Sequence, residues 1–311
     1  MQSPVTRALQ QRRARHAPPA TSRLQVILGS ASEGRRQVMA TLGVPFSTMR
    51  ADIDEKAVRH ADPYALPVVV AAAKCKALLQ RVRIPAVIIT ADQVVLGPVA
   101  TSAAARGGHP AANPAELAAA VGLPAGDPVV GFPEALAPGD GASDGDGSAE
   151  ATGTGGAADG TPAGNGRARC VVEVREKPES EAEAADFVRR YSGGWVQCVS
   201  GLVAHNTRTG QRAAAIDVAT VEFDAIPEEA QVAMLRPASG EPSPLLRSAG
   251  AVVVEHPAVA PFVRTMHAPI DSVMGLPKAL VRDLLAAVGG PVLPSEPQPA
   301  ALPHGSAAAA E

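Results

Sequence analysis

The chain has 311 residues, of which 46% are hydrophobic, and a formal net charge of −3, so it can bury a core and lacks the basic surplus typical of nucleic-acid-binding proteins. No apolar run reaches the roughly 18 residues that a membrane-spanning helix needs, so we expect a soluble protein with neither a membrane nor a nucleic acid as partner. The three cysteines include no Cys-x-x-Cys pair, which argues against a disulfide framework or a zinc site and favours a reducing, cytoplasmic compartment.

The first 23 residues carry five arginines and no acidic residue. We predict a disordered leader over 1–23. The alternative is a transit peptide that directs the chain to a plastid or mitochondrion, although the segment is poor in serine and only weakly amphipathic.

The stretch 24–36 is expected to form a strand, a tight turn and the start of a helix. A short β-suited apolar run ends at Gly29, and three apolar residues then recur at helical spacing: Val38, Met39 and Leu42. Such a turn presents free backbone N–H groups and the positive end of a helix dipole, and Arg35 and Arg36 add positive charge. We interpret the turn as a site for an anion such as phosphate; the alternative is that Ser32 only caps the helix.

Two later stretches bring further charges. Residues 52–55 contain three carboxylates, a pattern typical of a solvated loop, but Mg²⁺ at a phosphate site also needs one or two carboxylates. An apolar-rich helix is predicted over 66–82, with Pro67 either starting or kinking it. Lys74 falls on its apolar face, where it either extends to solvent or faces a pocket.

A second buried strand is predicted over 86–90, with Asp92 directly after it. In open α/β sheets ligands bind outside the carboxyl ends of strands, and a lone buried carboxylate is costly without a partner. Asp92 is therefore a candidate metal ligand or proton acceptor. The alternative is a strand-end cap or turn.

The composition changes in 97–170 to Ala, Gly, Pro and Asp, with one aromatic residue and no lysine. We predict a disordered low-complexity insertion apart from a short helix near 115–121. The remaining elements are expected in this order: a strand at 170–174, a helix at 181–191 capped by Ser180, two strands and a hairpin over 196–223, a helix at 228–235, a proline-rich loop at 237–244, a buried strand at 251–254 and a helix at 278–288. Residues 291–311 are predicted to be a disordered tail with no core to join.

Taken together, these pieces resemble the Maf-like nucleoside triphosphate pyrophosphatases, in particular those of plants and green algae. The matching motifs occur in the family's order: 27–32 with Arg35, 51–57, Lys74, 89–95, 175–178, 191–194, 255–257 and 271–277. The resemblance implies an α/β fold with a mixed sheet, flanking helices and two lobes around a cleft. It assigns 24–290 to one catalytic domain, interrupted by the insertion.

The resemblance also implies an enzyme that hydrolyses nucleoside triphosphates to the monophosphate and pyrophosphate, with Mg²⁺ or Mn²⁺, and so cleans nucleotide pools. It makes Asp92 the proton acceptor and, with Glu55, a metal ligand. Four residues are implied to contact phosphates: Ser30, Arg35, Lys74 and Lys177. Attack by water on the α-phosphorus needs a base and neutralised phosphate charge, and exchanging the roles of the two carboxylates fits equally well.

Two residues bear on the preferred base. The branch of the family that acts on 7-methyl-GTP has glutamine and glutamate at two positions where this chain has Gln93 and Glu255, so the chain resembles that branch. A carboxylate suits the positively charged methylated ring. The alternative for Glu255 is a solvated residue at the end of a strand. The alternative functions are a pyrophosphatase selective for dTTP or UTP, and a nucleotide-binding regulator of cell division without catalysis. The first turn is one residue longer than the bacterial pattern, so Arg35 and Arg36 are both candidates for the arginine that contacts phosphate. The sequence also leaves open whether the protein forms a homodimer.

Overall fold

The computed structural model describes residues 24–98, 114–124, 127–130, 172–236 and 243–294. The predicted leader, most of the predicted insertion, residues 237–242 of the predicted proline-rich loop and residues 295–311 lie outside these ranges, so the predictions for them stay predictions. Across the described ranges, the helices are all too short or too polar to cross a membrane. Cys75 and Cys198 are both buried and carry free thiols, and burial raises the pKa of each to about 12.

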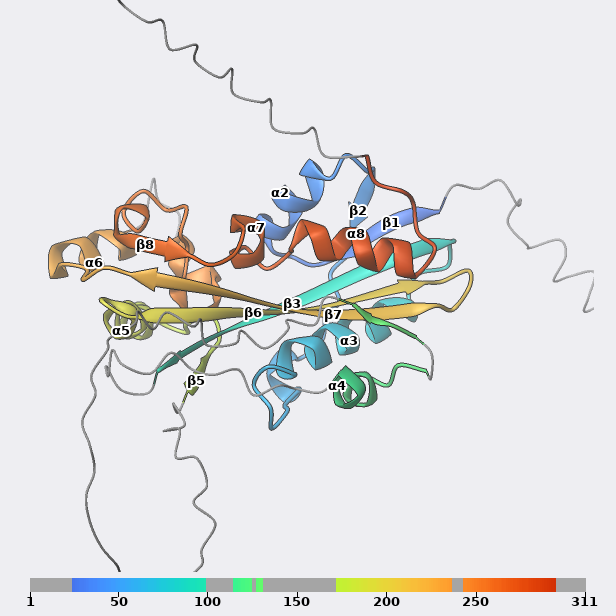
Figure 1. Cartoon of the computed structure of the whole chain (residues 1–311), viewed down its shortest axis with the longest axis horizontal. Coiled ribbons are helices and arrows are strands. Elements are labelled where there is room, and N and C mark those ends of the chain that lie inside the picture. The colour runs from blue at the N-terminus through green and yellow to red at the C-terminus, as the bar shows by residue number, and fades with distance from the viewer. Residues whose placement is uncertain (1–23, 99–113, 125–126, 131–171, 237–242, 295–311) are drawn as a thin grey trace, which may run out of the picture.

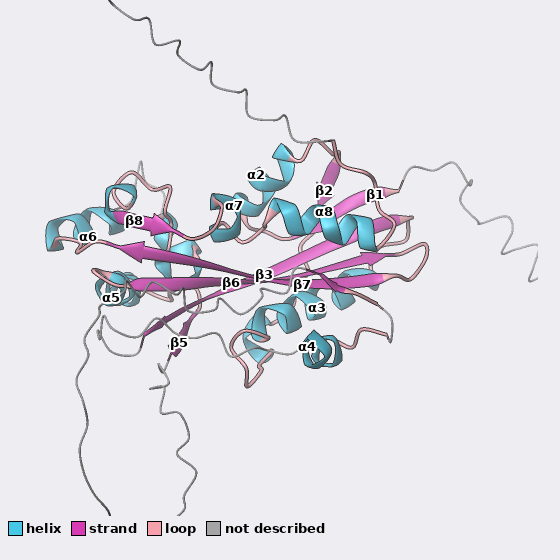
Figure 2. Ribbon diagram, viewed as in Figure 1, coloured by secondary structure: helices cyan, strands magenta, loops and turns pink. Residues whose placement is uncertain are grey.

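An eight-stranded mixed sheet forms the centre of the fold (Figures 1 and 2). Its continuous order is β2 (Phe46–Thr48), β1 (Gln25–Gly29), β3 (Ala86–Pro98), β6 (Trp195–Asn206), β7 (Arg212–Phe223) and β4 (Val129–Val130). Two further strands join it, β5 (Val172–Arg175) beside β3 and β8 (Val263–Met266) beside β7. Because β1 is parallel to β2 and β3 while β3, β6 and β7 are antiparallel, the predicted mixed α/β sheet is confirmed.

Helices cover both faces of this sheet (Figure 2). The α3 helix (Leu66–Leu79) packs on one face, and α2 (Glu33–Thr41) and α8 (Lys278–Ala287) pack on the other. The far end of the long strands is covered by α5 (Glu181–Tyr191) and α6 (Glu228–Leu235). Short helical turns complete the described chain: η1 (Glu55–Ala57), η2 (Pro244–Arg247), η3 (Ala249–Ala251), η4 (Ala260–Phe262) and α7 (Ile270–Val273).

The long strand β3 passes from one half of the core to the other. On one of its faces Ala91 belongs to the cluster under α2 and α8, whereas Val95 belongs to the cluster under α5 and α6. Gln93 lies between them on the same face, because side chains alternate along a strand. The opposite face carries Thr90 and Asp92 toward α3. The middle of β3 is therefore where two halves of the molecule meet.

The α3 helix lies against the sheet because a glycine faces it. A Cβ atom at Gly201 in β6 would lie 2.2 Å from the backbone nitrogen of Val68 and 2.4 Å from the carbonyl carbon of Pro67. Pro67 sits in the first turn of α3, where its missing N–H would have no helical partner. The Thr90 hydroxyl donates to the carbonyl oxygen of Ala71 at 2.7 Å, which ties the middle of the helix to β3.

Several predicted elements are confirmed with shifts of at most three residues at their ends. They include β1, α2, α3, α5, the hairpin of β6 and β7, α6 and α8. Ser180 caps α5 by accepting a hydrogen bond from the Glu183 backbone nitrogen at 3.1 Å, as predicted. The strands β2 and β8 were not predicted, since each is only three or four residues long.

Two strand predictions are corrected. β3 does not stop at Thr90 but continues to Pro98, because residues 87–96 pair with β6 and residues 95–98 pair with β5. Asp92 thus lies inside a strand and is neither a strand-end cap nor a turn residue. The strand predicted at 251–254 is wrong, because η3 ends at Ala251 and the next three valines are buried in irregular backbone.

The predicted insertion connects β3 to β5, two strands that pair with each other. Its described parts have regular structure. The predicted short helix is present as α4 (Pro114–Ala120), with Leu117 1% exposed within the α3 cluster. The strand β4 was not predicted and pairs with β7. The insertion is therefore not uniformly disordered, because these parts find apolar partners on the folded domain.

The start of the C-terminal tail also contacts the domain. Leu293 packs against the cluster under α2 and α8, and the Arg282 guanidinium donates to the carbonyl oxygen of Pro294 at 2.6 Å. The prediction of a tail with no core to join is therefore wrong for residues 291–294.

The close approach at Gly201 generates a stability prediction. Gly201→Ala should lower the free energy of unfolding by about 1–3 kcal/mol, because the methyl group meets backbone atoms of α3 that cannot move aside cheaply. Gly194→Ala is the matched control directly before the same strand, where the nearest atom to an added Cβ is 3.6 Å away. Urea unfolding of both variants checks this, and equal midpoints would contradict the packing described.

Candidate active site

Lys74 is a buried cation held by two carboxylates. Its side chain is 7% exposed, and its Nζ atom lies 2.6 Å from Asp92 Oδ1 and 2.9 Å from Glu55 Oε2. Side chains on a helix lean toward its N-terminus, so the lysine extends back along α3 to the middle of β3. Of the two alternatives for Lys74, the structure favours the one in which it faces a site. A buried ammonium requires such partners, since an unpaired buried charge is costly.

Asp92 lies just beyond the carboxyl end of β1. The register pairs Gly29, the last residue of β1, with Thr90 of β3, and β5 takes up the same side of β3 only from Val95. Residues 91–94 therefore have no strand partner on that edge within the described part of the chain. This opening outside a parallel strand end is where ligands bind in α/β sheets, and the Asp92 side chain there is 14% exposed.

Arg35 fills part of this open edge. Its Nη1 atom donates to the Ala91 carbonyl oxygen at 2.7 Å and its Nε atom donates to that of Gly275 at 3.0 Å. Burial lowers the pKa of Arg35, while the charges of Asp92 and Glu55 act in the opposite direction. The guanidinium therefore lies within the field of the same carboxylates that hold Lys74.

The two arginines of the first turn have different surroundings. Arg35 is 8% exposed, whereas Arg36 is exposed and pairs with Glu33 on the surface of α2. The backbone nitrogen of Arg35 donates to the Ser32 hydroxyl at 3.4 Å, so Ser32 does cap this helix. Of the two candidates that the sequence left open, the geometry places Arg35 at the site.

Ser30 shapes the turn between β1 and α2. Its half-buried hydroxyl oxygen accepts a hydrogen bond from the Ser32 backbone nitrogen at 3.2 Å. A Cβ atom at Gly29 would lie 2.5 Å from the Leu78 side chain and 2.6 Å from the Thr90 side chain, so a larger residue would displace these side chains where β1 ends against α3. The turn consequently lies beside the open edge of β3.

The three carboxylates of 52–55 have three different environments. Asp54 caps η1 by accepting from the backbone nitrogens at positions 56 and 57. Asp52 has a φ of 52°, a left-handed conformation that aspartate tolerates better than most residues, and pairs with Arg81 at 2.9 Å. Only Glu55, half exposed at 50%, contacts Lys74. The loop is thus partly solvated, as one alternative held, but contributes one carboxylate to the site.

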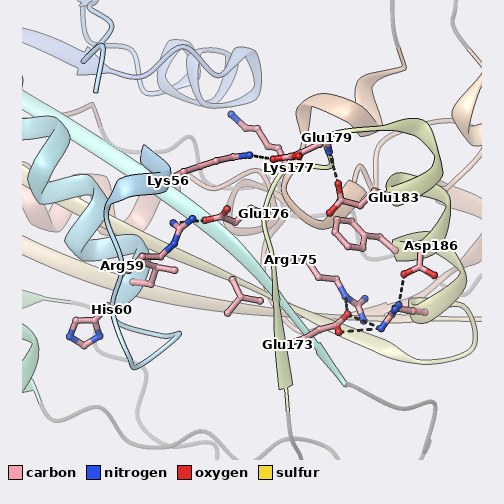
Figure 3. A pocket seen from close by; sticks show the side chains of 14 residues that line it. Lys56, Arg59, His60, Glu173, Arg175, Glu176, Lys177, Glu179, Glu183 and Asp186 are labelled. Atoms are coloured by element: carbon pink, nitrogen blue, oxygen red, sulfur yellow. Dashed lines mark hydrogen bonds and ion pairs between the residues drawn. The ribbon is translucent and has the colours of Figure 1, made fainter. Parts of the chain in front are cut away.

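Lys177 lies in the loop between β5 and α5 and is exposed. Figure 3 shows it with Lys56 and Glu179 along a pocket of about 590 Å³. No contact among the described residues joins it to Lys74 or Asp92, so the structure does not bring this predicted phosphate ligand into the Lys74 cluster.

Two ion pairs nevertheless connect the Lys177 loop to the Glu55 turn. Lys56 pairs with Glu179, and Arg59 pairs with Glu176 at 3.3 Å (Figure 3). All four side chains are at least 40% exposed, and such pairs contribute little to stability. They do show that the segments carrying Glu55 and Lys177 are neighbours.

The two predicted selectivity residues differ in how they are held. The side-chain nitrogen of Gln93 donates to the Ser200 hydroxyl at 3.1 Å and to the Val273 carbonyl oxygen at 2.9 Å. Its amide oxygen lies toward Gly275, where an added Cβ would be 3.1 Å from it. Glu255 is exposed in a turn after η3, and the described contacts do not connect it to Gln93.

Three residues with a part in this arrangement were not singled out as site residues. Ser200 holds the Gln93 amide, Gly201 lies directly opposite Asp92 in the register, and Gly275 supplies a carbonyl oxygen to Arg35. Gly275 has a φ of 83°, which favours glycine. Its motif, Met-Gly-Leu-Pro, was the one available signal for it.

A divalent cation fits the donor set at this site. Two carboxylates from separate segments, Asp92 and Glu55, already converge on a single positive charge, the Lys74 ammonium. Mg²⁺ is commonly held by one or two carboxylates together with water and substrate phosphates. In the described ranges, groups of three or more His, Cys, Asp or Glu that could hold a metal by themselves are absent.

Comparisons of the chain with known proteins identify a family to which it is similar. The family model described as "Maf-like protein" matches residues 25–118 and 168–288. A 7-methyl-GTP pyrophosphatase of Dictyostelium discoideum is 25% identical over 270 residues, covering 85% of this chain and 96% of the relative. A 7-methyl-GTP pyrophosphatase of Burkholderia thailandensis is 38% identical over 77 residues, 24% of this chain and 36% of the relative.

A third relative is named nucleoside triphosphate pyrophosphatase and comes from a Synechococcus strain. It is 31% identical over 70 residues, which is 22% of this chain and 36% of the relative. The family model covers more than half of the chain, and its two matched segments flank most of the predicted insertion. The chain therefore belongs to the Maf-like protein family.

Proposed function

We propose that this chain hydrolyses nucleoside triphosphates to the nucleoside monophosphate and pyrophosphate. The observation that carries the proposal is the Lys74 ammonium held between Asp92 and Glu55, with the Arg35 guanidinium beside them. This places two positive charges and two carboxylates at the carboxyl end of β1. The names of the three relatives, all pyrophosphatases that act on nucleotides, support the same reaction. Such an enzyme would remove unwanted nucleotides from cellular pools.

In the proposed reaction a water oxygen forms a bond to the α-phosphorus, and the bond from this phosphorus to the bridging oxygen breaks. Pyrophosphate leaves, and a carboxylate takes the proton of the attacking water. Asp92 is the proposed base, because Lys74 contacts only its Oδ1 atom and the described residues make no hydrogen bond to Oδ2. Glu55 is the alternative base, since it also meets Lys74 through one oxygen.

The remaining residues bind the triphosphate. Arg35 and Lys74 offer charge-assisted hydrogen bonds to phosphate oxygens, and Ser30 positions the turn whose backbone N–H groups face the same edge. Lys177 is proposed to reach the phosphates from the loop beside the Glu55 turn. Glu55 and Asp92 would hold Mg²⁺ or Mn²⁺, which supplies neutralising charge to the phosphate oxygens when bound.

For the substrate base we propose 7-methylguanine. Gln93 has its amide nitrogen occupied by Ser200 and α7, which leaves the amide oxygen as the group available to a base. Glu255 is exposed and can offer a carboxylate to the N–H edge of guanine, whose charge is positive after methylation. The names of the Dictyostelium and Burkholderia relatives support this choice.

Pyrophosphate release over a panel of nucleoside triphosphates, 7-methyl-GTP included, tests the proposed function. With Mg²⁺ or Mn²⁺ we expect turnover, fastest on 7-methyl-GTP, and a loss of at least about 100-fold in kcat for Asp92→Asn, because the base is removed. Asp224→Asn is the control, since among the described residues this exposed carboxylate forms an ion pair with Arg264 alone.

Each alternative has its own result in this experiment. Full turnover by a folded Asp92→Asn variant would contradict the assignment of Asp92 as the proton acceptor and would favour Glu55 in that role. If turnover is fastest on dTTP or UTP, the proposed preference for 7-methylguanine in the substrate is wrong. No turnover by wild type on any member, with nucleotide binding intact, would instead support a non-catalytic regulator.

The different surroundings of the two arginines generate a second prediction. Arg35→Lys should lower kcat/KM by roughly 10–150-fold, because lysine cannot keep both carbonyl contacts and also bind phosphate, and one charge-assisted hydrogen bond contributes about 1.5–3 kcal/mol. Arg36→Lys, on the exposed side of the same helix, should leave kcat/KM unchanged. Equal effects of the two substitutions would contradict the placement of Arg35 at the site.

A further inference from the structure

A second pocket lies on the side of α3 that faces away from Lys74. It has a volume of about 470 Å³ and is bounded by α3, by the end of α4 and by strands β6 and β7. Figure 1 shows α3 and α4 on the same side of the sheet. The volume falls within the range of small-molecule sites. Part of the wall comes from the segment between β3 and β5, so this pocket is separate from the site around Asp92.

The body of this pocket is apolar and lined by small side chains. On α3 the half-buried Ala72 and Ala73 face it, and Val121 and Leu123 face it from the end of α4. Val203 of β6 forms part of the floor. Leu117 anchors α4 in the core beneath, so the two helices are held in place while the alanines leave space between them.

The polar end of the pocket contains buried atoms with unmet hydrogen bonds. His205 and Arg212 lie opposite each other in the register of β6 and β7. The Nδ1 atom of His205 and the Nε atom of Arg212 are both buried and have no hydrogen-bond partner among the described residues. Leaving a buried polar group unpaired is unfavourable, so a ligand that supplies a hydrogen-bond acceptor here would be stabilised by it.

The residues that line this end carry positive charge only, although Asp127 lies close enough to act on His205. Lys76 and Arg212 line the pocket, and no carboxylate lies among the lining residues. Lys76 is exposed and makes no ion pair with a described residue. Burial and the charge of Arg212 both lower the pKa of His205, while Asp127 raises it. Asp127 precedes β4, and its Oδ2 atom is itself buried without a described partner, while Arg212 donates from Nη1 to the Gly122 carbonyl oxygen at 3.4 Å and keeps its Nε atom unpaired among the described residues.

We propose that this pocket binds a small amphiphilic anion, a molecule with an apolar body and a single carboxylate, sulfonate or phosphate group. The anionic group would meet Arg212 and Lys76, and the apolar body would lie between α3 and α4 against Ala72. An occupant would also brace the helix that carries Lys74 on its other face. The proposal is independent of the reaction at Asp92, because none of its residues belongs to that site.

Binding of the fluorescent probe 1-anilinonaphthalene-8-sulfonate to the full chain tests the proposal. We expect saturable binding that Arg212→Leu weakens at least tenfold, because the sulfonate loses its guanidinium partner. Arg208→Leu, an exposed arginine in the same hairpin, should bind as the wild type does. Ala72→Phe should also abolish binding by filling the space, while pyrophosphate release stays unchanged.

Competition separates the two halves of the proposed ligand. Octanoate should displace the probe, whereas octanol, which lacks the charge, and sulfate, which lacks the apolar body, should not at the same concentration. Equal probe affinity of wild type and Ala72→Phe would overturn the proposal, as would displacement by sulfate or octanol as effective as by octanoate. If circular dichroism shows that Arg212→Leu does not fold, Ala72→Phe and the competition series decide alone.

Discussion

The contact of Lys74 with Asp92 and Glu55 is the interaction on which the rest of the site depends. It joins three consecutive elements of the chain, namely the turn at η1, the helix α3 and the middle of β3. The charges of Lys74 and Asp92, 7% and 14% exposed, would be costly there without a counter-charge. The close packing at Gly201 brings α3 near enough for the lysine to reach. The contact that joins η1, α3 and β3 is therefore also the contact that brings the charged groups of the candidate site together.

The second constraint is the short length of β1. Because β1 ends at Gly29 and β5 begins to pair only at Val95, one edge of β3 stays open for four residues. Arg35 uses a carbonyl oxygen of this edge as an anchor, and Asp92 projects beside it. The same gap marks the change from one hydrophobic cluster to the other along β3. A substrate bound there would contact both halves of the molecule.

Sequence patterns predicted the helices and the hairpin well, because apolar spacing and caps such as Ser180 are local signals. They failed where tertiary pairing decides. Asp92 interrupts an apolar run and so resembles a strand end, yet β6 and β5 supply the hydrogen bonds that continue β3. The three valines after Ala251 resemble a buried strand, but they are buried by packing alone. Helical spacing did place Lys74 on the inner face, whereas the choice between Arg35 and Arg36 needed the distant Gly275.

A double-mutant cycle on the free energy of unfolding tests the central claim most directly. Lys74→Met, Asp92→Asn and the double variant would be unfolded in urea beside the wild type. A buried, mutually dependent pair predicts a coupling energy of about 1–3 kcal/mol, with the double variant less destabilised than the two single costs together imply. Costs that add within about 0.5 kcal/mol would contradict the account, because Lys74 and Asp92 would then be independent of each other.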